Sequence, residues 1–551
     1  MTGPAEVTGS ADVTGSGEVG RPEDRAGRGR AAAVFAVAFV ALLGLLVLRS
    51  RELFWRVIYE KGDLAANSII TYQAKHFDLL VGNYSRIGFS HPGPAYFYVQ
   101  AAGEWLLHDA LGLVPSPWNG QAVAIFAFNA ACLALALTVV FAWFRSLVPV
   151  VAAGGAALAY LAANGEVVTS TWMPHAYTTP FLLLLVAAAS VAAGRAGHLW
   201  LLVLAGGLLV HGHAEFLFFV PLIAGAALLA HWRQRRRGGA GVAGDHGHWL
   251  AATAVLAVFL LPIVLNLALH WPGEFGKYLT YGGGRGVHAP AEALRFQAQF
   301  WAADPWLALT VAVTLFAAVR LAAHCARGEA YAGLLLAGWR LTALGALLFF
   351  VYTGYGIDGL HETYVGYFSR AMPLALLMLA AAGWAALLPG LPGLRRLPEL
   401  RGVPGLPGPA HRRTVPPGAV APAFGAVVLA AGFVAAGLSP GLVNRRAEAP
   451  GVPHALEAMA ARAAGRPMVL EIAPHDAWPE ATSLVIGGVR RGHRVCVADP
   501  RWRVLVTAEF VCSGRDLADG ERFVVSRPGQ APPGATVLAD LHPSVVSLAR
   551  R

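Results

Sequence analysis

The segment GDLAANSIITYQAKHFDLLVGNYSRIGFSHPGPAYFYVQ, residues 62–100, directly follows the first strongly apolar stretch of the chain. Loops between membrane spans are usually short, whereas this one is long and polar. It carries Asp63, Asp78, Arg86 and His91 around a turn that is rich in proline and glycine. Ionisable side chains grouped at the edge of a membrane indicate function, so we expect the functional site in this loop.

The composition is that of a membrane protein. Hydrophobic residues make up 56% of the 551 residues and charged residues only 13%, and the mean hydropathy is +0.54. Because a soluble domain carries about 25% charged residues, we predict a polytopic α-helical membrane protein. The formal charge of +10 comes from arginines that cluster between the apolar stretches, as membrane topology requires. This distribution argues against a nucleic-acid partner.

About eleven apolar stretches are long enough to cross a bilayer. The ambiguous region is 199–231, which is either one broken helix or two short ones. The positive-inside rule places the basic clusters at 25–30, 233–237 and 395–413 in the cytoplasm. This requires six spans before residue 233, and therefore a split of the ambiguous region at HGHAE (211–215). The predicted spans are 32–49, 120–143, 148–163, 177–193, 199–211, 214–231, 249–269, 306–324, 341–356, 367–387 and 420–438.

This topology predicts a multi-pass plasma-membrane protein with a cytoplasmic N-terminus and an extracytoplasmic C-terminus. The first loop, 50–117, then lies outside, as do 164–176, 271–304 and 357–365. The predicted domains are a disordered cytoplasmic tail at 1–30, a transmembrane module at 31–440 with a cytoplasmic Pro/Gly/Arg-rich linker at 388–418, and an extracytoplasmic α/β domain at 441–551.

The α/β assignment of the C-terminal segment depends on its pattern. A helical stretch at 453–464 precedes short β-branched runs such as MVLEIAP (468–474) and RFVVSRPG (522–529). The segment has no glycine-rich phosphate motif, so nucleotide binding is not predicted. Cys496 and Cys512 pair if the domain faces an oxidising compartment, but the sequence leaves that pairing open.

The first loop and the external end of the predicted span 367–387 supply one candidate catalytic residue and several candidate substrate-binding residues. Asp63 can act as a general base that takes a proton from a hydroxyl nucleophile; the alternative is a solvated loop acid. Arg86 and Arg370 suit a phosphate because the guanidinium group pairs with its oxygens, or they anchor the interface beside tyrosines. His91 either binds substrate or caps the turn, and Asp78 is a polar neighbour in the loop.

Other predicted external segments add further candidates for substrate binding. Glu215 lies at the helix break near the membrane, where an ionisable residue indicates function. Glu166 is either a second carboxylate of the site or a solvated acid. Asp358, His361 and Glu362 could together bind a divalent metal, but their spacing does not require one. We therefore predict no cofactor.

Four segments resemble the GT-C superfamily of integral membrane glycosyltransferases, which includes bacterial mannosyl- and arabinofuranosyltransferases. The resemblance extends over roughly residues 30–300. It implies an inverting transferase that moves a sugar from a polyprenyl-phosphate donor to a cell-envelope glycan or lipid acceptor on the outer face of the membrane. The four segments are GDLAAN (62–67), YSRIGFSHPGPAYFY (84–98), STWMPHAYTTPFLLLL (170–185) and LLPIVLNLALHWPGEFGKYLTY (260–281).

The same resemblance assigns roles within the loop. It makes Asp63 the catalytic base and the His91–Pro94 turn part of the donor pocket. One departure is Leu64, because many relatives carry a second acid directly after the first. Two alternatives therefore stay open: a lipid-carrier flippase or transporter, and a non-catalytic member of an envelope-assembly complex.

Overall fold

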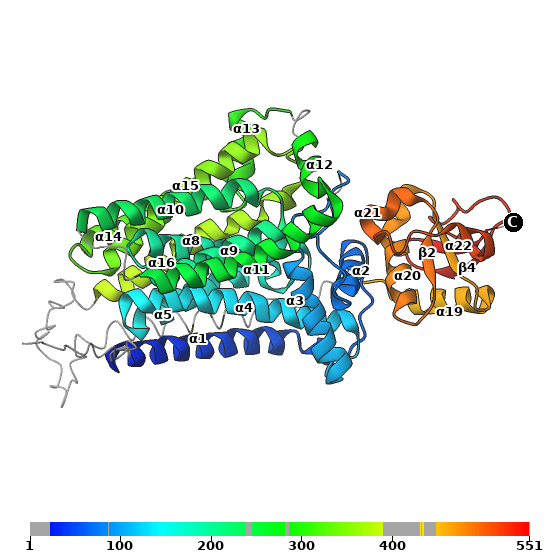
Figure 1. The fold of residues 1–551 in the computed structure, drawn as a ribbon, viewed down its shortest axis with the longest axis horizontal. Helices are drawn as coiled ribbons and strands as arrows, with labels where there is room; N and C mark the ends of the chain where they lie inside the picture. Colours follow the sequence, from blue (N-terminus) through cyan, green and yellow to red (C-terminus); the bar gives the residue numbers. More distant parts are fainter. Residues whose placement is uncertain are drawn as a thin grey trace, which may run out of the picture.

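The computed structural model describes residues 22–85, 87–238, 245–281, 286–388, 430, 432, 434 and 448–549. Long helices form a membrane module, and a small C-terminal domain lies beyond one end of these helices, next to α2 (Figure 1). The helices of the membrane module are α1 (Pro22–Arg49), α2 (Asp63–Lys75), α3 (Ala95–Gly103), α4 (Pro117–Phe144), α5 (Leu147–Ala163), α6 (Glu166–Thr169), α7 (Met173–Ala176), α8 (Thr178–Ala192), α9 (Leu199–Gly212), α10 (Phe216–Gly238), α11 (His246–His270), α12 (Gly273–Tyr281), α13 (Pro290–Ala298), α14 (Pro305–Cys325), α15 (Tyr331–Tyr355) and α16 (Ala371–Leu387).

The predicted polytopic helical architecture is confirmed. Among the described residues, 8 helices are long and apolar enough to cross a membrane, and α5 and the region of α9 form two shorter apolar helices. Helices α9 and α10 are separate, which confirms the predicted split at HGHAE. The eleventh predicted span, 420–438, lies almost entirely outside the described residues, so the count of eleven stays a prediction.

The N-terminal boundary differs from the expected one. Helix α1 begins at Pro22, inside the segment 1–30 that we predicted to be a disordered tail. Proline is favoured in the first turn of a helix, where its missing N–H has no intrahelical partner. Residues 1–21 lie outside the described residues, as does nearly all of the predicted linker.

The centre of the membrane module is α8. Its residues from Thr178 to Val191 are all buried, because α4, α9, α10, α15 and α16 contact it from different sides. Alanines at 187–189 contribute little side-chain volume, which lets the neighbouring helices approach closely. The outer helices α11 and α14 instead expose large apolar side chains such as Leu250 and Val313, as expected of surfaces that face lipid.

The predicted external loop 50–117 is largely folded. It contains α2, α3 and a π-helical turn at Glu104–Ala110. Helix α2 belongs to two hydrophobic cores at once: Ile70 packs with the membrane module, whereas Ala65 and Ile69 pack with the C-terminal domain. The helix that begins with Asp63 is therefore held from both sides.

The predicted C-terminal α/β domain is confirmed. Its single sheet has the order β2-β1-β3-β5-β4; β1 runs parallel to β2 and β3, and β5 is antiparallel to β3 and β4. A disulfide joins Cys496 in β2 to Cys512. The elements are α19 (Val452–Ala463), β1 (Met468–Ile472), α20 (Trp478–Val489), β2 (Val495–Val497), α21 (Arg503–Val506), α22 (Gly514–Asp519), β3 (Glu521–Ser526), β4 (Thr536–Asp540) and β5 (Val545–Leu548).

Candidate active site

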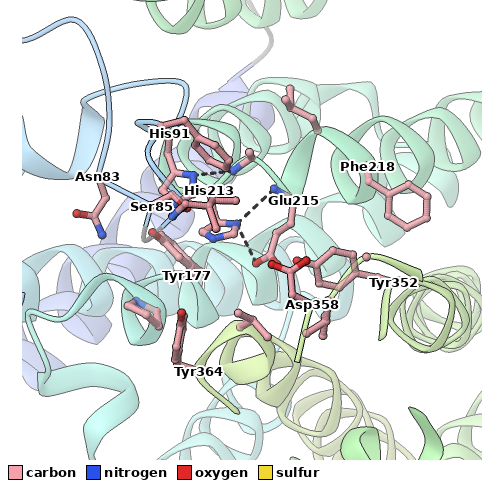
Figure 2. A pocket seen from close by; sticks show the side chains of 18 of the residues that line it. Asn83, Ser85, His91, Tyr177, His213, Glu215, Phe218, Tyr352, Asp358 and Tyr364 are labelled. Atoms are coloured by element: carbon pink, nitrogen blue, oxygen red, sulfur yellow. Dashed lines mark hydrogen bonds and ion pairs between the residues drawn. The ribbon is translucent and has the colours of Figure 1, made fainter. Parts of the chain in front are cut away.

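A cavity of about 680 Å³ lies between the segments that connect the membrane helices (Figure 2). Segments that were predicted to lie outside the membrane, together with the ends of predicted spans, meet in its wall, although they are far apart in the sequence. These segments therefore share one side of the membrane module. The wall is formed by residues of the start of α2, the hairpin 83–91, the stretches 172–177, 213–218, 351–358 and 364–365, and Tyr278.

Asp63 lines this cavity as the first residue of α2. Gly62 precedes it with φ at 61°, a conformation that glycine adopts without strain. The Tyr84 hydroxyl and the Trp172 indole N–H both donate hydrogen bonds to the Asp63 carboxylate. Burial raises the pKa of Asp63 above its ordinary value, and these two hydrogen bonds oppose part of the increase. Leu64, which stands where many GT-C enzymes carry a second acid, packs against the core of the membrane module.

His91 is buried beside the break between α9 and α10, because the His-Pro-Gly-Pro turn packs against the end of α9. The His211 ring lies 2.4 Å from the position that a Cβ on Gly93 would occupy, so only glycine fits there. The turn thereby brings His91 against His213, with ring centroids 4.0 Å apart. His91 Nδ1 accepts a hydrogen bond from the Ala214 N–H at 3.2 Å. Burial, reinforced by His213, lowers the pKa of His91 well below its ordinary value, so the neutral ring holds its proton on Nε2.

The opposite part of the cavity combines carboxylates with aromatic rings. Glu215 and Asp358 point toward one another in Figure 2. The buried Glu215 carboxylate accepts a hydrogen bond from the Tyr352 hydroxyl and lies 3.6 Å from His213 Nδ1. The aromatic residues of the wall are Tyr84, Phe89, Trp172, Tyr177, Phe218, Tyr278, Tyr352, Tyr355 and Tyr364.

Two predicted acids lie away from this cavity. Asp78 is exposed beyond the last turn of α2. Since that helix has 13 residues and an α-helix rises about 1.5 Å per residue, about 20 Å separate its two ends. Asp78 therefore does not accompany Asp63 in the site. Glu166 points mainly into solvent, with a side chain that is 69% exposed and paired with His175 at 3.3 Å.

Arg370, one of the two predicted phosphate-binding arginines, does not line the cavity. The Arg370 guanidinium lies over the Tyr367 ring at 4.7 Å, the interfacial arrangement that we gave as its alternative role. Arg86 lies outside the described residues, although Ser85 and Ile87 on either side of it line the cavity. Among the described lining residues there is no lysine or arginine.

The three residues that could together have bound a metal, Asp358, His361 and Glu362, do not come together in the cavity. Asp358 lines the cavity, whereas the His361 side chain is 77% exposed and pairs with Glu362 at 3.4 Å. Among the described residues, no group of three His, Cys, Asp or Glu side chains could hold a metal ion.

Sequence reasoning missed most of the aromatic wall. Tyr84 and Trp172, which donate hydrogen bonds to Asp63, lie in motifs that were recognised, but neither residue was singled out. Their role depends on contacts between distant segments. Tyrosine and tryptophan are also common at membrane interfaces in general, so their presence in these loops carried no specific signal.

Comparison with known proteins identifies the fold. No family model and no curated protein matches the chain by sequence. Among solved structures, it resembles ArnT from Cupriavidus metallidurans in the apo state, with a TM-score of 0.54, 16% identity, and coverage of 94% of this chain and 98% of ArnT. The same enzyme bound to undecaprenyl phosphate gives a TM-score of 0.55 at 15% identity, with coverage of 93% and 97%. The GT-C-like fold that the sequence predicted is therefore confirmed.

A third similarity is much weaker. The archaeal oligosaccharyltransferase AglB from Archaeoglobus fulgidus, in complex with an inhibitory peptide and a dolichol-phosphate, gives a TM-score of 0.34 at 12% identity. The match covers 91% of this chain and 69% of AglB. This similarity is too low to support an argument about the site.

Proposed function

We propose that this chain is a membrane glycosyltransferase that moves a sugar from a polyprenyl-phosphate donor to a hydroxyl group of a cell-envelope glycan or lipid. One observation carries the proposal: a half-buried carboxylate, Asp63, lies in a cavity whose wall also offers aromatic rings and the carboxylates of Glu215 and Asp358. Such a wall suits a sugar, because aromatic faces can pack against the sugar ring and carboxylate oxygens can accept hydrogen bonds from its hydroxyl groups. The ArnT-like fold adds support, because ArnT has been seen with undecaprenyl phosphate bound.

The chemistry follows from the donor. Asp63 takes the proton of the acceptor hydroxyl while its oxygen forms a bond to the anomeric carbon of the sugar. The bond from that carbon to the phosphate oxygen breaks in the same displacement, and the electron pair leaves with the polyprenyl phosphate. A single displacement inverts the anomeric configuration. The raised pKa of Asp63 suits this role, since a stronger base accepts the proton more readily.

We further propose that the cavity faces the outside of the cell. The arginine cluster 233–237 lies at the end of α10 that is farthest from the cavity, because the cavity is lined by residues at the start of this helix. The positive-inside rule assigns that cluster to the cytoplasm. The disulfide in the C-terminal domain supports the same orientation, since disulfides persist in oxidising compartments.

A transfer assay tests the proposal. Purified protein is mixed with membranes from a strain that lacks the gene and with a panel of undecaprenyl-phosphate monosaccharides, each radiolabelled in the sugar. We expect one donor to lose its label to a new product and to release undecaprenyl phosphate. If the protein instead carries a labelled lipid across a vesicle bilayer with its sugar still attached, the chain is a flippase and the proposal is wrong.

A further inference from the structure

The C-terminal domain contacts the membrane module at the carboxyl-terminal edge of its parallel strands, the edge at which α/β sheets generally bind ligands. In α/β sheets, ligands bind outside the carboxyl ends of the parallel strands, where the chain connections diverge. Residues that follow β1 and β3 converge at this edge: Arg527 donates to the Asp476 carbonyl at 2.7 Å and lies 3.5 Å from Glu480 Oε2. Ser544 donates to the same Glu480 oxygen at 2.8 Å. Glu480 is only 1% exposed.

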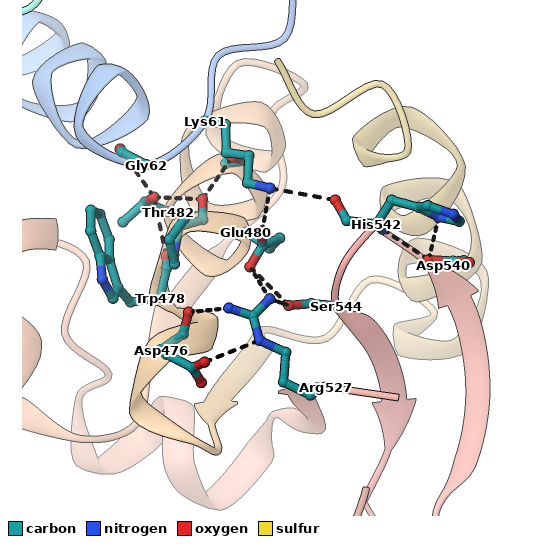
Figure 3. A network of polar contacts seen from close by, with 12 residues as sticks. Lys61, Gly62, Asp476, Trp478, Glu480, Thr482, Arg527, Asp540, His542 and Ser544 are labelled. Carbon is teal, nitrogen blue, oxygen red and sulfur yellow. Dashed lines mark hydrogen bonds and ion pairs between the residues drawn. The ribbon is translucent and has the colours of Figure 1, made fainter. Parts of the chain in front are cut away.

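The other oxygen of Glu480 reaches into the membrane module. Figure 3 shows the ion pair between Lys61 and Glu480, in which Lys61 Nζ lies 2.5 Å from Glu480 Oε1. The next residue is bound through its backbone, because the Gly62 N–H donates to the Pro479 carbonyl at 3.1 Å. The Thr482 hydroxyl lies 3.4 Å from the Gly62 carbonyl oxygen. The segment directly before α2 thus occupies the edge of the sheet where a small ligand would otherwise bind.

We propose that Glu480, through its ion pair with Lys61, is a positioning residue for the Asp63 carboxylate. Asp63 follows the bound Lys61–Gly62 segment directly, and Ala65 and Ile69 on the next turns are buried in the core of the C-terminal domain. The domain therefore fixes the start of α2 by an ion pair, a backbone hydrogen bond and apolar packing. This inference rests on the proposed function, in which Asp63 is the base.

The alternative is that this contact only attaches the domain. Two further ion pairs join the C-terminal domain to the membrane module, and they allow attachment of the domain to be distinguished from positioning of Asp63. Arg490 pairs with Glu60 at 2.5 Å, and Arg56 pairs with Glu448 at 2.5 Å. These pairs do not involve Glu480, so the domain should stay attached when its pair with Lys61 is lost. A variant can then loosen the start of α2 without releasing the domain.

The experiment uses the full chain in lipid nanodiscs. Lys61→Met removes the ion pair from the membrane-module side and leaves the Glu480–Arg527 contact intact, whereas Glu480→Gln removes it from the domain side. Lys61→Arg keeps the charge and should rescue. Glu471→Gln is the matched control, because its carboxylate pairs with Arg522 on the domain surface at 3.0 Å. Each protein is measured by hydrogen exchange of the peptide 59–68, and by kcat and KM for the undecaprenyl-phosphate sugar that is active in the transfer assay.

We expect Lys61→Met and Glu480→Gln to exchange at least about tenfold faster in this peptide and to lose about 10- to 100-fold in kcat. A displacement of about 1 Å at a reacting group has an effect of that size. KM for the donor should stay within about twofold, since these residues do not line the cavity. Lys61→Arg and Glu471→Gln should behave like the wild type.

Two results overturn the inference. One is faster exchange at 59–68 with unchanged kcat, and the other is unchanged exchange in both Lys61→Met and Glu480→Gln. Asp63→Asn distinguishes these results from a failure of the proposed function. If Asp63→Asn is inactive while Lys61→Met is fully active, only the positioning role is wrong. If Asp63→Asn is fully active, the role of Asp63 as base is wrong, and the positioning role fails with it.

Discussion

Replacing Asp63 with Asn should abolish transfer without disturbing the fold. A positioned general base contributes about 10²- to 10⁴-fold to rate, which corresponds to about 3 to 5 kcal/mol of transition-state stabilisation. The Asn side chain has nearly the same shape and keeps an oxygen that can accept the hydrogen bond from Tyr84. It has no basic carboxylate, so kcat should fall by this factor.

The effect on stability should be small, and its sign follows from the pKa of Asp63. Because burial raises this pKa in the folded state, ionisation of Asp63 lowers the free energy of unfolding as pH rises through the folded-state pKa. Asn removes that penalty at neutral pH. It also removes a favourable interaction with the N-terminus of α2, worth about 0.3 to 1 kcal/mol. These two terms oppose each other, so thermal unfolding at pH 7 should change little.

The assay is complementation of a strain that lacks the gene, with the envelope glycans measured by mass spectrometry and the purified proteins compared by thermal unfolding. Asp78→Asn is the matched control, because it makes the same chemical change at the exposed, opposite end of α2. We expect Asp78→Asn to restore the glycans and Asp63→Asn to fail at equal protein level. Full restoration by Asp63→Asn would refute the assignment of the base.

The remaining predictions concern the pKa of the base and the stability of the C-terminal domain. Tyr84→Phe removes a hydrogen bond that lowers the pKa of Asp63, so the acidic limb of the kcat profile should move to higher pH; no movement would exclude that hydrogen bond. Asp516→Asn should lower the free energy of unfolding by about 1 to 3 kcal/mol at pH 7, because Arg494 donates two hydrogen bonds to this carboxylate, at 2.5 and 2.7 Å. These bonds hold the pKa of Asp516 below its ordinary value, so the difference in denaturant unfolding should persist above about pH 4 and shrink at lower pH. Cys496→Ala removes a disulfide that closes a 16-residue separation and should lower the unfolding free energy of the domain by about 3 kcal/mol; equal stability in reduced and oxidised wild-type protein would contradict this.

The sequence was sufficient to predict features that have a strong local signal. Long apolar stretches predicted the membrane helices, and the arginine clusters predicted the separation of α9 from α10. Asp63, His91 and Glu215 were each predicted to be functional, and all three line one cavity. Each had a local reason to be noticed, since each is an ionisable residue beside an apolar stretch.

Features that depend on contacts between distant segments were not predictable. Asp78 was grouped with Asp63 because both lie in one polar segment, but α2 forms between them and separates them. The hydrogen bonds from Tyr84 and Trp172 to Asp63 join three segments of the chain. The contact between Glu480 and Lys61 spans more than four hundred residues of sequence, and neither residue is unusual in its local pattern.

Mass spectrometry of the lipid that co-purifies with the Asp63→Asn protein tests the central claim most directly. A transferase without its base should retain its donor, so we predict undecaprenyl phosphate that carries a single sugar. The wild-type protein should hold undecaprenyl phosphate without the sugar, because it completes the transfer. If neither protein carries any polyprenyl phosphate, the claim that this cavity uses a lipid-linked sugar is wrong.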